Sequence, residues 1–325
     1  MCTLTLAWQV FADAPVALAA NRDEALDRAA EPPAIRDGTG DGTDDDAGNG
    51  DATDDDTGDG DATDDDDTGD GTVRYVAPRD AQAGGTWIGL TDDGLVVAVT
   101  NRWLDADRDG ERSRGLLVRD CLEADSAEDA RQTVERSVAT RAYDGFNLVI
   151  ADARSAFLLA YDGALAVTRL DAGVHVVGNV GGVVGGAERF SIPERRRAFG
   201  DERAASARAV ADALAPDSEE SVDAWLDRAS AVLADHEYGA CLHGDDFGTV
   251  SFTRIRTGPD PAFAYADGPP CETDPVSVSL PPGFDTGGEG DSGDAIDTGD
   301  EDDGDSEADG GGGVDTVPDD AESQF

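Results

Sequence analysis

Residues 2–24 read CTLTLAWQVFADAPVALAANRDE, and this stretch predicts the centre of the fold. Its two apolar runs, 2–10 and 15–20, are typical of β-strands, and residues 11–14 between them are typical of a turn. The strands are expected to pair as an antiparallel hairpin, which returns the polar tetrapeptide 21–24 to the first residues of the chain. A cysteine at the start of one strand thereby gains a guanidinium and a carboxylate as neighbours.

Cys2 is the strongest candidate for chemistry in this hairpin. Removal of an initiator Met before a small residue leaves a free α-amine, whose pKa near ~7.7–8.0 suits a general base for the thiol. We expect Arg22 to lower the thiol pKa, and Asp23 to hold the ammonium or orient a substrate. Because neighbouring residues of a strand face opposite ways, only one of these two side chains is expected on the face of the thiol. The alternative is an inert cysteine beside an ion pair that faces solvent.

The rest of the core alternates short strands with amphipathic helices. Asp92-Asp93-Gly94 has turn chemistry for a second hairpin, and Ser126 and Ser221 are candidate helix caps. Strands in meanders and helices in blocks predict an α+β fold with antiparallel sheets. The expected strands are 86–90, 95–100, 147–151, 156–161, 165–169, 174–178, 249–255 and 262–266. The expected helices are 127–141, one that follows Ser221 and one that starts near Glu188. A flexible glycine loop over 181–186 is expected before the helix near Glu188.

Two acidic stretches lie outside this pattern. Residues 37–72 contain 16 Asp and no large apolar side chain, and residues 281–325 are also rich in acids and Gly. Neither stretch can bury enough apolar surface to offset the entropy of ordering, so both are predicted to be disordered. The expected organisation is a single domain over residues 1–280, interrupted by the 37–72 insertion and followed by the 281–325 tail.

The charge of the chain excludes some partners and indicates an environment. With 72 acidic and 24 basic residues the formal net charge is −48, which disfavours binding to nucleic acid and to anionic membranes. At molar salt the Debye length falls to about 3 Å, so such an acidic surface stays hydrated without strong self-repulsion. The charge therefore predicts a halophilic protein that works in a salt-rich cytoplasm. No apolar run is long enough to predict a transmembrane helix.

Several further segments, together with Cys2, resemble the NRDE family, whose animal member is transport and Golgi organisation protein 2. The resemblance covers residues 2 to about 256 and is carried by NRDE at 21–24, GGTWIG at 84–89, VTNR at 99–102, GFNL at 145–148, VGN at 177–179, YGACLH at 238–243 and FGTVS at 247–251. This family is similar to N-terminal nucleophile (Ntn) hydrolases, especially the cysteine-type penicillin V acylases and bile salt hydrolases.

The resemblance implies a four-layer αββα sandwich with two antiparallel sheets and a site around the N-terminal cysteine. It implies that Cys2 is the nucleophile, that Arg22 and Asp23 flank it, and that Asn101 and Asn179 bind the oxyanion and the α-amine. The implied function is a cysteine amidohydrolase acting on a small linear amide or N-acyl compound. The alternative is a non-catalytic binder or carrier of a hydrophobic ligand such as an acyl-CoA, a lipid or haem.

No cofactor or metal is expected. His236, Cys241 and His243 lie close in sequence, but their spacing is not a usual zinc spacing and lacks a fourth ligand. The glycine pairs within 181–186 lack the downstream acid of a dinucleotide site. For haem, the only histidine candidates are His175, His236 and His243, and none lies in a recognisable ligand motif.

Overall fold

The computed structural model describes residues 2–37, 74–106, 108, 110–282, 284 and 286. These residues fall in one compact unit, Met1–Gly288. Most of the two predicted acidic appendages lies outside the described residues. The boundaries of the described part differ slightly from the predicted ones, because Phe284 and Thr286 are buried and the Thr286 hydroxyl donates to the carbonyl of Gly258.

The first sheet has the predicted N-terminal hairpin at its centre. Every neighbouring pair in this eight-stranded sheet is antiparallel, and Thr3 lies opposite Asn21, so the second strand continues through the NRDE tetrapeptide. In spatial order the strands are β12 (Ala187–Phe190), β11 (Gly181–Val184), β10 (Gly173–Gly178), β1 (Thr3–Phe11), β2 (Ala14–Ala25), β13 (Phe247–Arg256), β14 (Ala262–Ala266) and β15 (Val276–Ser277).

The second sheet is a seven-stranded antiparallel meander in chain order. Its strands are β3 (Ala30–Asp37), β4 (Arg74–Asp80), β5 (Ile88–Thr91), β6 (Val96–Asn101), β7 (Phe146–Ala151), β8 (Ala156–Tyr161) and β9 (Leu165–Arg169). Asp37 pairs with Arg74, so the two described ends that flank the acidic stretch 38–73 lie side by side at the edge of this sheet. Asp37 itself, predicted to be part of the disordered insertion, is the last residue of β3.

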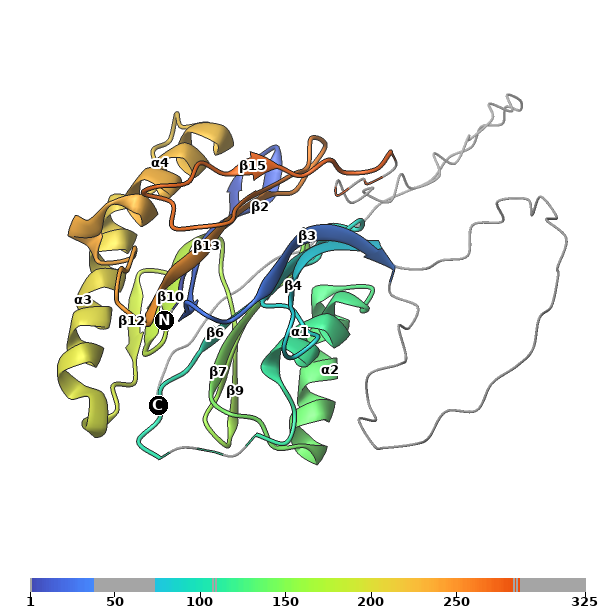
Figure 1. Ribbon diagram of the computed structural model, residues 1–325. Helices are drawn as coiled ribbons and strands as arrows, with labels where there is room; N and C mark the ends of the chain where they lie inside the picture. The colour runs from blue at the N-terminus through green and yellow to red at the C-terminus, as the bar shows by residue number, and fades with distance from the viewer. Residues whose placement is uncertain are drawn as a thin grey trace, which may run out of the picture. The chain divides into compact units, whose positions relative to one another are not determined.

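Helices cover the outer face of each sheet (Figure 1). The helices α3 (Arg197–Ala213) and α4 (Val222–Ala234) pack on the first sheet, and α1 (Arg114–Leu122) and α2 (Ala127–Thr140) pack on the second. Of two short 3₁₀ turns, η1 (Glu194–Arg196) precedes α3 and η2 (His236–Tyr238) follows α4. The hydroxyls of Ser126 and Ser221 cap α2 and α4, as predicted. The four-layer αββα sandwich is therefore confirmed.

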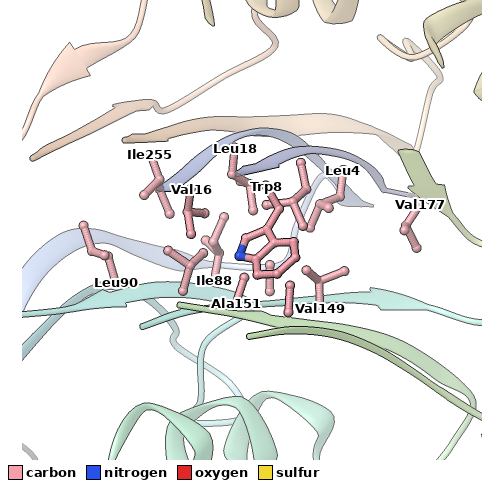
Figure 2. Close-up of a cluster of buried hydrophobic side chains, with 14 of the residues drawn as sticks. Leu4, Trp8, Val16, Leu18, Ile88, Leu90, Val149, Ala151, Val177 and Ile255 are labelled. Carbon is pink, nitrogen blue, oxygen red and sulfur yellow. The ribbon is translucent and has the colours of Figure 1, made fainter. Parts of the chain in front are cut away.

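The alternation of side chains along β1 and β2 fills the space between the two sheets. Leu4, Leu6 and Trp8 of β1 and Val16 and Leu18 of β2 point into this central core, where they meet the inner face of the second sheet (Figure 2). The intervening alanines of both strands face α3 and α4 instead. This alternation also places Cys2, two residues before Leu4, on the side that faces the second sheet.

The segment after β10 differs from the prediction of a flexible glycine loop followed by a helix near Glu188. Residues 181–190 form the β11–β12 hairpin, and the helix begins only at Arg197. The glycines allow the tight pairing: Gly181 has a φ of +98°, and a Cβ on Gly182 would lie 1.8 Å from the Val176 carbonyl oxygen. Helix α1 was also missing from the sequence prediction.

Candidate active site

Cys2 lies where strands from both sides of the central hairpin end. Thr3 pairs with Asn21, so one further residue places Arg22 on one side of Cys2; Leu4 pairs with Val177, so two further residues place Asn179 on the other side. The half-buried thiol lies 4.0 Å from the backbone carbonyl oxygen of Asp23. It lines a cavity of about 70 Å³ together with Arg22, Asp23, Trp87 and Asn101.

Arg22 is held firmly in the space between the sheets. Its guanidinium lies 4.0 Å from the centroid of the Trp87 ring, and it is 3.7 Å from Asp80 and 3.8 Å from Glu24. Only 6% of its side chain is exposed. Asp80 is fixed in turn by Arg28, which donates to it at 2.8 Å. Trp87, the tryptophan of the GGTWIG motif, is partly buried; it packs against the central core and also lines the cavity.

Asp23 also reaches the thiol, although strand alternation predicted that only one of Arg22 and Asp23 would do so. Both side chains line the cavity of the thiol. Asp23 lies at a bulge in the pairing of β2 with β13, where Thr249 pairs with Asp23 and Ser251 with Arg22. The Thr249 hydroxyl donates to the Asp23 carboxylate at 2.5 Å. Burial raises the pKa of Asp23 to about 7, although Thr249, Arg203 and the Cys2 thiol favour the ionised form.

Arg22 acts on the thiol pKa in the predicted direction, but the net pKa is raised and not lowered as expected. Burial raises the pKa of the Cys2 thiol, and the charge of Arg22 offsets only part of this effect. The negative charge of Asp23 acts in the same direction as burial. A thiol with a raised pKa needs a nearby base before it can act as a nucleophile at neutral pH.

The two predicted asparagines lie next to each other and beside Cys2. Asn179 donates from its side-chain amide to the Asn101 carbonyl oxygen at 2.7 Å, and its own carbonyl accepts from the Trp103 backbone N–H at 2.9 Å. The Cys2 carbonyl oxygen is 3.6 Å from the position that a Cβ on Gly178 would occupy. The Oδ1 atom of Asn179 is buried and has no hydrogen-bond partner among the described residues. It is therefore an acceptor available to a donor that enters the site.

A third asparagine, to which the sequence analysis gave no role, joins these loops. Asn147 is buried and donates to the Gly178 carbonyl oxygen at 2.8 Å, and it accepts from Arg102 at 3.1 Å. The motifs VTNR, GFNL and VGN are thus tied together at the mouth of the site. The presence of these three motifs in the sequence was the available signal for this connection. The spacing of the motifs could not show that the Asn147 side chain makes the contact between them.

A larger cavity adjoins the one at Cys2 and shares Asn101 and Arg114 with it. Its volume is about 440 Å³, and its wall combines arginines and aromatic side chains with one carboxylate, Asp144, which pairs with Arg114 at 3.4 Å. The residues of this second cavity that matter for recognition are Arg102, Arg114, Arg195, Arg196, Trp103 and Phe199. The Arg196 guanidinium lies 4.9 Å from the centroid of the Trp103 ring. In a chain of net charge −48, a concentration of arginines at one cavity favours an anionic ligand.

The structure also gathers residues that the sequence analysis had discounted as a metal site. Cys271, far along the chain from His236, Cys241 and His243, completes a cluster with them. No signal in the spacing linked Cys271 to the other three, because β13 and β14 lie between them. This cluster is separate from both cavities.

The fold, with two antiparallel sheets between helical layers and a cysteine at the start of a central strand, is similar to the Ntn-hydrolase fold. The family model described as Transport and Golgi organisation 2 matches residues 67–190, a range that holds the motifs from GGTWIG to VGN. The predicted resemblance to the NRDE family is thereby confirmed.

Two solved structures are similar to the chain. A mutant of the conjugated bile acid hydrolase from Clostridium perfringens is similar with a TM-score of 0.50 and 9% identity, over 86% of this chain and 92% of that one. The Caenorhabditis elegans N-acylethanolamine-hydrolyzing acid amidase orthologue has a TM-score of 0.45 and 13% identity, over 78% of this chain and 92% of that one. No curated protein sequence matches the chain. No described helix is both long and apolar enough to span a membrane.

Proposed function

We propose that the protein is a cysteine amidohydrolase that cleaves a small linear amide or N-acyl compound, with Cys2 as the nucleophile. The observation that carries the proposal is the meeting of four separate segments at one thiol. The start of β1, the end of β2, the end of β6 and the end of β10 bring Cys2, the Arg22–Asp23 pair, Asn101 and Asn179 together. Packing alone rarely collects so many polar groups around one half-buried thiol.

The α-amine of Cys2 supplies the base in this proposal, which requires removal of Met1. The amine takes the thiol proton, and the sulfur attacks the substrate carbonyl carbon to form a tetrahedral oxyanion. The amine then protonates the leaving nitrogen as the C–N bond breaks, which leaves a thioester on Cys2. Water, deprotonated by the same amine, attacks the thioester and releases the acid and the thiol.

The neighbouring groups take complementary parts in these steps. The Asn179 Oδ1 atom accepts a hydrogen bond from the α-amine, since this buried acceptor has no partner among the described residues and lies across from Cys2 in the strand register. The Asn101 side chain, on the wall of the cavity, donates to the oxyanion. Arg22 and the ionised form of Asp23 stabilise the charges on sulfur and nitrogen.

The substrate class follows from the second cavity. Its arginines and aromatic side chains suit a compound with an apolar portion and a carboxylate, such as an N-acyl amino acid. The scissile amide would then lie at Asn101, where the two cavities meet. Arg196, stacked near Trp103, is a recognition residue for the carboxylate.

The decisive experiment measures amine release from a panel of N-acylglycines and the matched neutral N-acylglycinamides in molar KCl. We expect the wild type to prefer the carboxylates, and Cys2→Ala to lose activity by on the order of 10³-fold or more. Cys121→Ala is the matched control because Cys121 is buried away from both cavities, in the core under α1. Arg196→Gln is expected to raise KM for the N-acylglycines and to leave the neutral amides unaffected.

Mass spectrometry supplies the second readout. After an acid quench, the wild type should carry an acyl group on Cys2, and its intact mass should lack Met1. Retention of Met1, or equal rates in the wild type and Cys2→Ala, contradicts the proposal. Tight ligand binding that survives Cys2→Ala without turnover would favour the carrier of a hydrophobic ligand. Haem would then lack a histidine ligand here, because all three histidines are in the described part of the chain and none lines either cavity.

A further inference from the structure

A cluster of two cysteines and two histidines lies on the surface beside the end of α4. His236 comes from η2, Cys241 and His243 from the loop that leads into β13, and Cys271 from the loop after β14. The chain has only three histidines and four cysteines in its 325 residues. Two of each therefore meet at this one place, which is difficult to attribute to chance.

The geometry of the cluster is that of a four-ligand metal site. One ligand atom from each side chain can be chosen so that all four lie within 4.8 Å of one another. The Cys241 and Cys271 sulfurs are 3.5 Å apart, and the His243 Nε2 atom is 3.7 Å from the first and 3.1 Å from the second. The rings of His236 and His243 are 5.1 Å apart and meet edge to face.

We propose that Cys241, Cys271, His243 and His236 bind one Zn²⁺ ion. Bond lengths of about 2.3 Å to sulfur and 2.0–2.1 Å to nitrogen place the ligand atoms of a tetrahedral zinc site about 3.3–3.8 Å apart. The distances among Cys241, Cys271 and His243 already lie close to this range, so small side-chain movements complete the tetrahedron. Thiolate and imidazole ligands favour zinc over Ca²⁺ or Mg²⁺, which take oxygen ligands.

The four protein ligands leave no open position, so the site is structural. Zinc there joins the loop before β13 to the loop after β14. The loop that carries Cys241 and His243 also contacts the candidate active site, since Leu242 exchanges hydrogen bonds with Thr249, and Thr249 donates to Asp23. The metal thus fixes the loop that positions the Asp23 partner.

The test uses the full chain, purified under reducing conditions in molar KCl and titrated with Co²⁺ and Zn²⁺. We expect one Co²⁺ per chain with thiolate-to-cobalt charge-transfer absorption and the intense visible bands of a tetrahedral site, and displacement of the Co²⁺ by one Zn²⁺. Cys271→Ser and His236→Ala, both at exposed residues, should weaken binding at least 10-fold, in the range typical of a lost or weakened ligand. Cys2→Ser and Cys121→Ser are the controls that should keep full binding.

Stability gives an independent readout. A chelator should lower the Tm of the wild type and of both controls but leave the Tm of Cys271→Ser unchanged, since that variant has no bound metal to lose. Two results would overturn the proposal: a Co²⁺ titration without thiolate bands, or binding that survives both ligand variants. A count of two free thiols in place of four, in protein denatured with a chelator and without reductant, would identify a disulfide in place of the metal site, and would overturn it as well.

Discussion

Replacement of Asp23 by asparagine should change how the stability of the protein depends on pH. Burial raises the pKa of this carboxyl group from 3.8 to about 7. Between these values the folded state keeps a proton that the unfolded chain has lost, so the folded state binds more protons and the free energy of unfolding falls as the pH rises. Above pH 7 the Asp23 carboxyl group is ionised in both the folded and the unfolded state, and the free energy of unfolding falls no further from this cause.

The magnitude follows from the size of the shift. Each pKa unit corresponds to about 1.4 kcal/mol, so a shift of about 3 units destabilises the wild type by roughly 4 kcal/mol at pH 7 and above, compared with pH 4. The neutral amide that replaces the carboxyl group in Asp23→Asn cannot ionise, while its oxygen can still accept the hydrogen bond from Thr249. The stability of Asp23→Asn relative to the wild type should therefore rise by about 1.4 kcal/mol per pH unit between pH 4 and pH 7.

Urea unfolding in molar KCl, at half-unit pH steps from 4 to 8, measures this difference directly. Every other carboxyl group is shared by the two proteins, so its titration cancels in the comparison. Asp201→Asn, at an exposed site on α3, is the control and should show no such slope. A difference between Asp23→Asn and the wild type that stays flat across the window, or that falls with pH, would refute the reasoning from burial.

Three other predictions follow from the packing and the charge. Trp225→Ala should lower the free energy of unfolding by about 3–5 kcal/mol in urea, because this fully buried ring fills the layer under α4 and donates to the Leu214 carbonyl oxygen; a loss below 1 kcal/mol would contradict it. Gly85→Ala should cost about 1–3 kcal/mol in the same assay, since the new Cβ would lie 2.2 Å from the backbone of Gly115, and an unchanged midpoint would argue against this close approach. The Tm should fall as KCl is lowered from molar to low concentration, because weaker screening increases self-repulsion in a chain of net charge −48, and a flat Tm would exclude this interpretation.

Local patterns made most of the strands and two of the helices predictable. Alternation of apolar residues identified β1, β2 and the β5–β6 hairpin, and the serine caps identified α2 and α4. The same rules missed β3, β4, β11, β12 and the two-residue β15. The prolines, glycines and exposed polar residues of β3, β11 and β12 do not resemble strands until a neighbouring strand pairs with them.

The candidate site was predictable in its membership but less so in its chemistry. The motifs identified Cys2 and the two asparagines as members of one site. The predicted direction of the thiol pKa shift was wrong, because burial raises this pKa and the burial comes from the second sheet, which covers the hairpin. The partners Thr249 and Asn147 could not be assigned from spacing, since each contact joins segments far apart in the chain. Cys271 was missed for the same reason.

The four residues of the NRDE tetrapeptide lie in three different parts of the fold, which separates its structural roles from its proposed catalytic ones. Asn21 is buried on the helical side, where its amide donates to the carbonyls of Leu233 and Ala240 and fixes the end of α4. Glu24 pairs with Arg22 and Arg28 at the edge of the site. Of the four residues, Arg22 and Asp23 are the ones that reach the thiol. A substitution of Asn21 should therefore lower the free energy of unfolding more than it lowers the proposed activity, because the Asn21 contacts fix α4 and do not touch the nucleophile.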